Sequence, residues 1–240
     1  MHASDPIRVK LLRGIYPVLN FTPETDADAL LDWAVQLPDA GIRLVQVRAK
    51  QFPDETLPTV LDDITSMLRG AGLAVILNDY VELVGITGAD GVHLGTDDFP
   101  ISDARKILGP AAIIGATCRN PEQALTAVGQ GASYVAAGSV YESKTKGGLP
   151  VMGIGGLKEI AACFSDPGAL RPGQSPGHSL PVCAIGGITV ERLRDVHAAG
   201  ASMAAMVDAI QGADDPVAAA FDLTREWDRL EWERRPGIVS

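Results

Sequence analysis

Short, β-branched apolar runs alternate with amphipathic stretches along almost the whole chain, and this alternation constrains the fold more than any other feature. Most of the runs are continuously apolar, which is typical of parallel strands that are covered on both faces. The sequence predicts eight such strands, at Gly14–Asn20, Leu44–Ala49, Ala74–Asp79, Gly91–Leu94, Ile113–Thr117, Tyr134–Val140, Pro181–Gly186 and Met203–Val207.

Proline and glycine mark the boundaries of the helices between these strands. Thr22-Pro23, Asn120-Pro121 and Asp215-Pro216 each pair a capping oxygen with a proline at the first helical position. A glycine that can take the left-handed conformation at a helix end precedes most of the later strands, at Gly41, Gly72, Gly88, Gly109, Gly131 and Gly200. Their spacing indicates eight βα units, and eight parallel strands favour a closed barrel over an open sheet.

A chain of 240 residues fits one (β/α)8 barrel of the TIM type, so we expect a single α/β domain over residues 1–240. It would begin with an extension at residues 1–13 and end with a helix from Pro216 to Trp232, where Trp227 and Trp232 pack on the barrel, and a frayed tail at residues 234–240. Residues 165–179 contain three Pro, three Gly and three Ser, which predicts a mobile loop.

The chain is acidic, with 30 Asp and Glu against 20 Lys and Arg and a net charge of −10. A nucleic-acid-binding protein normally presents a basic field, so that class is disfavoured. Three cysteines without a CxxC motif suit a reducing compartment, and the sequence has no signal peptide and no apolar run of membrane-spanning length. We expect a cytoplasmic globular protein with no nucleic-acid or membrane partner; the sequence leaves open whether it is a homo-oligomer.

Functional residues of such a barrel come from the carboxyl ends of its strands. At the end of the second strand, alternation points Gln46, Arg48 and Lys50 to one face. Three polar side chains facing a barrel interior are costly unless they meet a ligand, which predicts an anion-binding wall. The alternative is a network of salt bridges in the top layer of the barrel.

Two acidic residues follow the next two strands. Asp79 ends the third strand and Asp98 follows the fourth, so the two carboxylates can share a hard cation such as Mg²⁺, which takes one or two carboxylates together with phosphate oxygens. For each aspartate taken alone, the alternative is a helix N-cap.

Three further segments suit phosphate groups. The loop after the sixth strand mixes hydroxyls, lysines and glycines in Ser143-Lys144-Thr145-Lys146-Gly147-Gly148. Gly186-Gly187 and Val207-Asp208 end the seventh and eighth strands, where barrels commonly bind phosphate. Two phosphorylated groups bound side by side, one of them with Mg²⁺, indicate transfer chemistry in which pyrophosphate departs. His93 lies within a strand and is predicted to be structural, and Cys118 has no neighbouring base and is predicted to be an inert thiol.

Together these motifs resemble the thiamine phosphate synthase family over nearly the whole barrel. The family's Q-[LF]-R-x-K and N-D patterns are matched by residues 46–50 and 78–79. Its G-A-D-G-x-H-x-G-Q-x-D and G-A-D-Y-V-x-x-G-P patterns correspond to residues 88–98 and 131–139, its T-x-T-K loop to residues 143–146 and its A-I-G-G-I to residues 184–188.

The resemblance implies that the protein joins a hydroxymethylpyrimidine diphosphate to a thiazole phosphate and releases pyrophosphate. It implies Mg²⁺ at Asp79 and Asp98, and a diphosphate held by Arg48, Lys50, Asn78 and Lys146, of which the three cations would assist the departure of the leaving group. It also implies a pyrimidine site at Gln46 and Thr117, and a thiazole phosphate held by Ser143, Thr145, Gly187 and the backbone of Val207-Asp208, with Lys144 and Gly186 beside it.

The chain departs from the family pattern at several positions. Thr96, Thr117, Arg119, Ser139 and Ser143 replace Gln, Ser, His, Pro and Thr, and Asp208 stands where the family usually carries Ser. A carboxylate about 4 Å from a phosphate costs roughly 4 kcal/mol per charge pair at an effective dielectric constant of 20. Either Asp208 turns away and only its N–H is used, or Lys144 or Arg119 compensates, or the second substrate differs. The alternatives to a synthase are a non-catalytic thiamine-phosphate-binding paralogue and a thiazole tautomerase-like enzyme.

Overall fold

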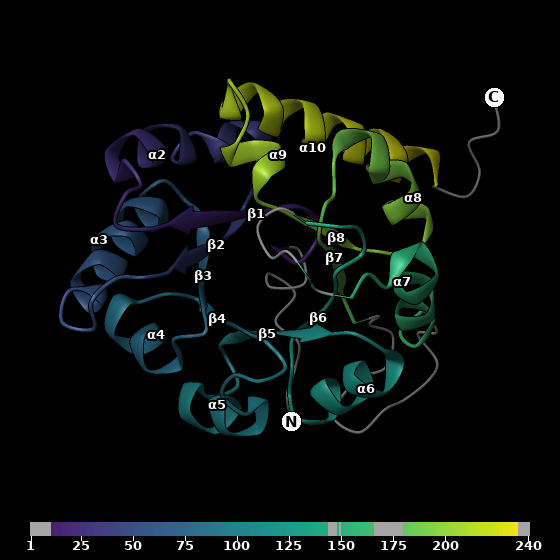
Figure 1. Ribbon diagram of the computed structural model, residues 1–240, viewed down its shortest axis with the longest axis horizontal. Helices are drawn as coiled ribbons and strands as arrows, with labels where there is room; N and C mark the ends of the chain where they lie inside the picture. The colour runs from purple at the N-terminus through teal and green to yellow at the C-terminus, as the bar shows by residue number, and fades with distance from the viewer. Residues whose placement is uncertain (1–10, 144–147, 149, 166–179, 235–240) are drawn as a thin grey trace.

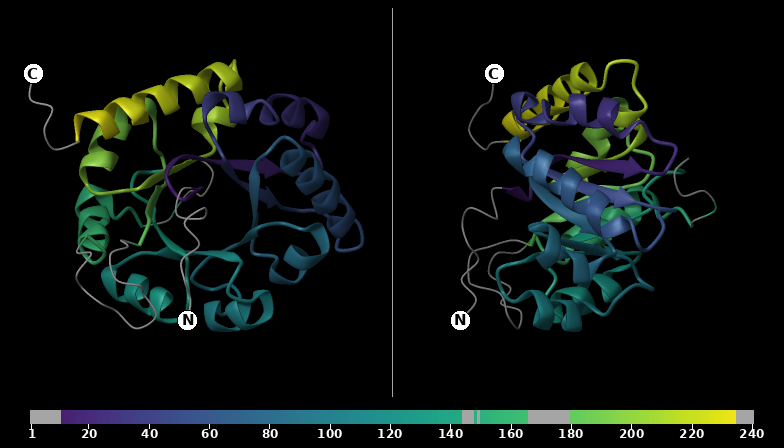
Figure 2. Two further views of the ribbon diagram at one scale, coloured as in Figure 1. Left: turned by 180° about the vertical axis from the view of Figure 1, so that it is seen from behind. Right: turned by 90° about the vertical axis from the view of Figure 1, so that its left-hand side faces the viewer.

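The computed structural model describes residues 11–143, 148, 150–165 and 180–234. These residues form a closed barrel of eight parallel strands in the order β1-β2-β3-β4-β5-β6-β7-β8, with helices around the outside (Figure 1). The predicted (β/α)8 barrel is therefore confirmed. Figure 2 shows the barrel from behind and from the side, where the strands run inside the ring of helices.

All eight predicted strands are present, with small differences at their ends. They are β1 (Gly14–Phe21), β2 (Leu44–Ala49), β3 (Ala74–Asn78), β4 (Gly91–Leu94), β5 (Ile113–Cys118), β6 (Tyr134–Ala137), β7 (Val182–Ile185) and β8 (Met203–Met206). The barrel closes where β1 pairs with β8, with Tyr16 opposite Ala205.

Between the strands lie α2 (Ala27–Ala34), η1 (Leu37–Ala40), α3 (Leu57–Gly70), α4 (Val81–Thr87), α5 (Ile101–Leu108), α6 (Pro121–Gly129), α7 (Gly153–Ala162), η2 (Val190–Arg192), α8 (Leu193–Ala198), α9 (Asp208–Gln211) and α10 (Pro216–Glu233). The six glycines predicted to end helices all have positive φ, between 68° and 102°. In the part of the chain that the structure describes, no helix combines the length and the apolar character needed to cross a membrane.

Two of the three predicted N-caps are confirmed. The Asn120 side chain accepts a hydrogen bond from the Gln123 N–H, and the Asp215 side chain accepts one from Ala218. The prediction at Thr22-Pro23 is wrong, because the Thr22 N–H is bound to the Thr25 hydroxyl in a turn and the helix begins later, where Asp26 caps it by accepting from the Ala29 N–H.

The apolar core has two parts. One lies between the barrel and its helices, and the other fills the barrel interior with side chains such as Val18, Ile76 and Met203. Leu12, which the sequence analysis assigned to the N-terminal extension, is 5% exposed and belongs to the interior cluster. Residues 1–10 and 235–240 and most of the predicted loop, residues 166–179, lie outside the described residues.

The two C-terminal tryptophans differ. Trp227 on α10 is 2% exposed and its ring meets that of His197 edge to face at 5.1 Å, so its predicted packing on the barrel side is confirmed. Trp232 is 55% exposed, so the prediction that it packs on the barrel is wrong. At about 100° per residue, the five positions from Trp227 to Trp232 amount to one full turn and roughly 140° more, which carries Trp232 away from the buried side of α10.

This difference predicts unequal effects on stability. Trp227→Ala removes a buried aromatic ring and should lower the free energy of unfolding by about 3–5 kcal/mol. Trp232→Ala is the matched control and should cost well under half of that, since little buried surface is lost. Urea denaturation followed by circular dichroism measures both. Equal losses in the two variants would contradict the burial described here.

Candidate functional site

A cavity of about 530 Å³ opens at the carboxyl ends of the strands. Every strand end or the loop after it contributes to its wall, as the parallel order of the barrel requires. The predicted site residues that line it are Gln46, Arg48, Asn78, Asp79, Asp98, Thr117, Ser143, Gly186, Gly187, Val207 and Asp208. Lys144, Thr145 and Lys146 lie outside the described residues.

The basic wall comes from β2. Gln46 and Arg48 both line the cavity, as the alternation predicts, and Gln46 is only 3% exposed. The Arg48 guanidinium donates to the Asn20 side-chain oxygen through Nη1, whereas its Nε is buried and has no hydrogen-bond acceptor among the described residues. A half-buried guanidinium whose Nε donor is unused is suited to an anionic ligand that supplies the missing acceptor.

Lys50 does not line the cavity itself. Its Nζ lies 2.6 Å from Asp79 Oδ2 and 5.9 Å from the centroid of the Tyr80 ring. Of the three polar residues of β2 and its end, Lys50 therefore fits the alternative prediction, a salt bridge in the top layer of the barrel. The Lys50 ammonium remains next to the acidic residues of the same rim.

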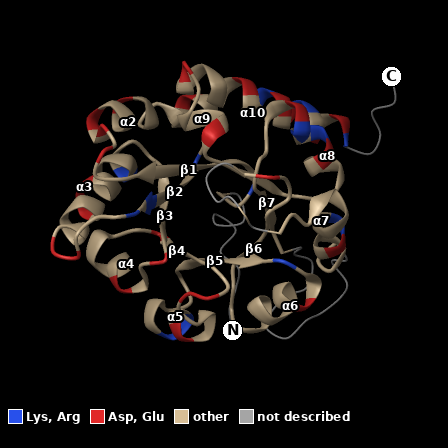
Figure 3. Cartoon of the chain, viewed as in Figure 1, with Lys and Arg blue, Asp and Glu red and all other residues tan. Residues whose placement is uncertain are grey.

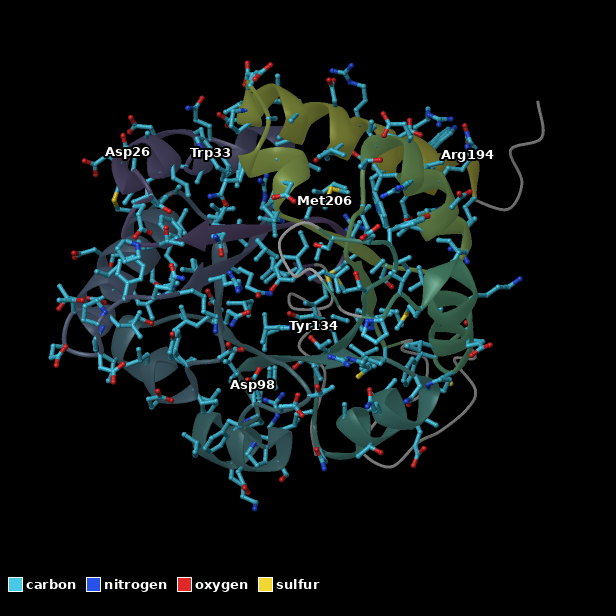
Figure 4. The ribbon with its side chains drawn as sticks, in the orientation of Figure 1. Asp26, Trp33, Asp98, Tyr134, Arg194 and Met206 are labelled. Carbon is cyan, nitrogen blue, oxygen red and sulfur yellow. The ribbon has the colours of Figure 1, made fainter. Side chains whose placement is uncertain are left out.

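Asp79 and Asp98 are brought together at the ends of β3 and β4. Burial, then hydrogen bonding with Asp79 and repulsion from it, raises the pKa of Asp98. Asp98 Oδ2 also accepts from the Gly95 N–H at 2.6 Å. Neither aspartate caps a helix, since α4 and α5 begin without a side-chain cap. In the view of Figure 4, Asp98 is labelled between α5 and the strands of the barrel.

Two adjacent carboxylates fit a shared divalent cation. Burial and, to a smaller extent, the neighbouring Asp79 raise the pKa of Asp98, and a hard cation between the two carboxylates would remove their repulsion. Among the described residues no group of three or more His, Cys, Asp or Glu is placed to hold a metal. Mg²⁺ keeps water and substrate oxygens among its ligands, so one or two protein carboxylates can suffice for it.

The turn after β7 requires its two glycines. Gly186 and Gly187 have φ of 102° and 60°, and a Cβ at these positions would lie 2.0 Å from Ser139 Oγ and 2.2 Å from the Glu142 carbonyl oxygen. Only glycine therefore lets this backbone pass so close to the segment after β6. The result is exposed backbone on the cavity wall, which an anionic group can approach closely.

Arg192 is a cavity residue that the sequence analysis missed. It lies on η2 just beyond the glycine turn, where its guanidinium stacks 4.3 Å from the centroid of the Tyr141 ring and donates to the Gly187 carbonyl. In the sequence, the feature that could have identified Arg192 is its position five residues after Gly187. It places a positive charge on the wall that also contains Asp208, which is exposed at the start of α9. Arg119, another candidate to compensate Asp208, lines the same cavity.

Buried polar residues form the floor of the cavity. His93 on β4 is 6% exposed and makes hydrogen bonds with the Tyr134 hydroxyl and the Thr117 hydroxyl, both at 2.9 Å. It is thus a hydrogen-bonded interior histidine, as predicted. The sequence analysis did not identify Tyr16 and Tyr134. A tyrosine within an apolar strand looks like an ordinary core residue, and the partners of both hydroxyls come from other strands.

Charge is distributed unevenly over the molecule. Figure 3 shows that most charged residues lie on the outer helices, with acidic and basic segments mixed along α10. Among the described residues, the cavity wall gathers three arginines, Arg48, Arg119 and Arg192, and five acidic residues, Asp79, Asp97, Asp98, Glu142 and Asp208. Local charge at this rim, and not the net charge of −10, decides what the cavity binds.

Comparison with known proteins places these features in context. Residues 15–210 match the sequence model of a family described as thiamine monophosphate synthase. The chain is 38% identical to the thiamine-phosphate synthase of Anaeromyxobacter dehalogenans over 181 residues, which cover 75% of each chain. It is 34% identical to that of Roseiflexus castenholzii over 218 residues, covering 90% of this chain and 89% of the relative. The solved thiamine phosphate pyrophosphorylase of Pyrococcus furiosus superposes with a TM-score of 0.73 at 26% identity, over 92% of this chain and 98% of that one.

Cys118, which ends a strand close to the cavity, is predicted to be chemically inert. Cys118 ends β5 but is 1% exposed and packs in the core between barrel and helices, where burial raises its pKa to about 12. It should therefore stay unmodified when the folded protein is treated with iodoacetamide at pH 8, while the half-buried Cys163 reacts. Mass spectrometry of wild type and Cys163→Ser checks this, and alkylation of Cys118 in the folded protein would show that the thiol faces the cavity.

Proposed function

The chain belongs to the thiamine monophosphate synthase family and is a transferase, and from this we propose that its cavity joins a hydroxymethylpyrimidine diphosphate to a thiazole phosphate. The products are thiamine phosphate and pyrophosphate. The observation that carries the assignment of the site is the acidic pair Asp79–Asp98 lying directly beside the basic end of β2. Such a pair of opposite charges suits a diphosphate that arrives with its own cation.

We assign the diphosphate to Arg48, Lys50, Asn78 and Lys146. Asp79 and Asp98 would hold Mg²⁺, which supplies neutralising charge to the phosphate oxygens. Arg48 offers its unused Nε–H, and Lys50 stands next to Asp79, where it can donate to the same oxygens. These groups lower the cost of the negative charge that develops as the diphosphate leaves.

The reaction needs little else from the protein. The bond between the pyrimidinyl methylene carbon and the diphosphate oxygen breaks, and its electron pair leaves with the diphosphate. The electron-rich aminopyrimidine stabilises the methylene cation, and the lone pair of the thiazole nitrogen forms the new carbon–nitrogen bond. No proton is removed in this attack, so no general base is required, and the chain's task is to hold the two rings in contact.

We assign the thiazole phosphate to the opposite wall, with Ser143, Thr145, Gly186, Gly187 and the Val207-Asp208 backbone around it. Arg192 is a cation of this wall, and we propose that Lys144 supplies a second. Arg192 lies beyond the glycine turn and keeps further N–H groups besides the one that reaches Gly187. Its positive charge offsets the carboxylate of Asp208, which would otherwise repel a phosphate here.

The direct test is to incubate the protein with both substrates and Mg²⁺ and to measure thiamine phosphate and pyrophosphate. The proposal predicts equal amounts of the two products and none when either substrate is omitted. Tight binding of thiamine phosphate without any product would instead support the non-catalytic paralogue, a reading motivated by Thr96, Arg119 and Asp208. Isomerisation of a thiazole phosphate without pyrophosphate release would support the tautomerase-like enzyme.

Asp79→Asn tests the metal assignment. Asp79 has a φ of 74°, which asparagine tolerates, so the substitution removes the charge and keeps the backbone. We expect kcat to fall roughly 100-fold or more, since a preorganised charge at the leaving group is lost. Asp103→Asn removes a charge from the outer helix α5, away from the cavity lining, and should stay within about threefold of wild type. Unchanged turnover in Asp79→Asn would rule out this residue as a ligand.

Asp208→Ser and Arg192→Gln test the thiazole wall. Arg192→Gln should raise the KM for the thiazole phosphate roughly tenfold, because a charged hydrogen bond is worth about 1.5–3 kcal/mol. Asp208→Ser should lower the same KM by removing repulsion. Both variants should leave the KM for the pyrimidine diphosphate unchanged. An unaltered thiazole KM in Asp208→Ser would mean that the carboxylate points away from the phosphate.

A further inference from the structure

A chain of hydrogen bonds crosses the barrel interior and ends at the cavity on both sides. Gln46 Nε2 on β2 donates to the Tyr16 hydroxyl on β1 at 3.2 Å, and that hydroxyl lies 3.0 Å from the Tyr134 hydroxyl on β6. Tyr134 lies 2.9 Å from His93 Nδ1, and His93 Nε2 lies 2.9 Å from Thr117 Oγ1 on β5. Figure 4 labels Tyr134 near the middle of the barrel.

The two tyrosines of this chain are sealed from solvent, whereas both of its ends lie on the cavity wall. Tyr16 and Tyr134 are 1% and 0% exposed, and Gln46 and Thr117 line the cavity. Room for the chain depends on Gly115, where a Cβ would lie 2.3 Å from the Tyr134 hydroxyl oxygen and 2.5 Å from His93 Nδ1. The ring of His93 also stacks on that of Tyr134, with centroids 5.6 Å apart.

The direction of the protons follows from the acceptors that the two tyrosine hydroxyls have. Burial raises the pKa of both tyrosines, so each keeps its single hydroxyl proton. The Tyr16 oxygen accepts from Gln46 Nε2, and among the described residues the acceptor bonded to its own hydroxyl is the Tyr134 oxygen, so the Tyr134 proton is left to His93 Nδ1. Among the bonds of the described residues, this order gives each tyrosine proton an acceptor.

The direction of the protons also determines the role of the Thr117 hydroxyl. With Nδ1 as an acceptor, the neutral imidazole carries its proton on Nε2 and donates it to Thr117 Oγ1. The Thr117 hydroxyl proton cannot then point back at His93, so it is available to the cavity that Thr117 lines. At the other end, Gln46 uses its Nε2 on Tyr16 and retains its amide oxygen as an acceptor.

We propose that Tyr134 is a positioning residue that sets the direction of this chain, fixes His93 as the Nε2–H tautomer and makes the Thr117 hydroxyl a hydrogen-bond donor to the substrate. A donor from Thr117 and an acceptor from Gln46 match an aminopyrimidine, which offers a ring nitrogen and an adjacent amino group. The identity of that ring rests on the proposed function, whereas the tautomer is a property of the free protein.

The first measurement uses the free protein. Nitrogen-15 NMR of the histidine side chains at neutral pH, with His93→Gln to assign the signals, should show Nε2 protonated and Nδ1 unprotonated in wild type. In Tyr134→Phe the donor to Nδ1 is gone, and the Nε2–H form should lose its dominance. A charged ring, an Nδ1–H tautomer in wild type, or an unchanged tautomer in Tyr134→Phe would overturn the proposal. The wild-type spectrum decides the tautomer even if the variant does not fold.

The second measurement is kinetic. Tyr134→Phe should raise the KM for the pyrimidine diphosphate about tenfold and leave the KM for the thiazole phosphate within about twofold. The double variant with Thr117→Val should have nearly the same KM for the pyrimidine diphosphate as Thr117→Val alone, because both changes remove the same donor. Tyr16→Phe is the matched control: among the described residues, His93 Nδ1 is then the acceptor that remains for the Tyr134 hydroxyl, so this variant should show no such coupling to Thr117. Multiplying effects of Tyr134→Phe and Thr117→Val would overturn the proposal. Failure of wild type to form thiamine phosphate would refute the proposed function and leave the NMR result standing.

Discussion

Closure of the sheet is the constraint on which the rest of the molecule depends. Each strand pairs in parallel with a neighbour on either side, and β1 completes the ring by pairing with both β2 and β8. A ring of parallel strands has no free edge, and it delivers every carboxyl end to one rim. Residues as far apart in the sequence as Arg48 and Gly187 therefore line one cavity. The interior below that rim is filled with side chains, so the cavity has a floor as well as walls.

Electrostatics then divides the rim into two parts. On one side the Asp79–Asp98 pair stands against Lys50 and the end of β2. On the other, glycine backbone lies beside Arg192. The first part suits a highly charged group that comes with a cation, and the second suits a single phosphate. An acidic protein can bind two anionic molecules in this way, because dissolved ions screen the charges on the outer helices over about 10 Å at 0.1 M salt.

The sequence predicted best what depends on period and on special backbone conformations. Alternation placed Gln46 and Arg48 on one face, and the helix-ending glycines marked the units of the barrel. Features that depend on contacts between distant segments were harder to foresee. The Tyr16–Tyr134 contact joins strands more than a hundred residues apart, and Arg192 is placed by a ring that comes from the loop after β6. The prediction of a helix cap at Thr22 was wrong because its N–H is bound in a turn. The prediction that Trp232 packs on the barrel was wrong because its position around α10 faces it to solvent.

The central claim is that the acidic pair and the basic strand end form one site for a diphosphate bound together with a divalent cation. Isothermal titration of the protein with inorganic pyrophosphate, in Mg²⁺ and again in EDTA, tests it most directly. The account predicts binding at least tenfold tighter with Mg²⁺, since without the cation the carboxylates repel the ligand. Equal affinity under the two conditions would contradict it.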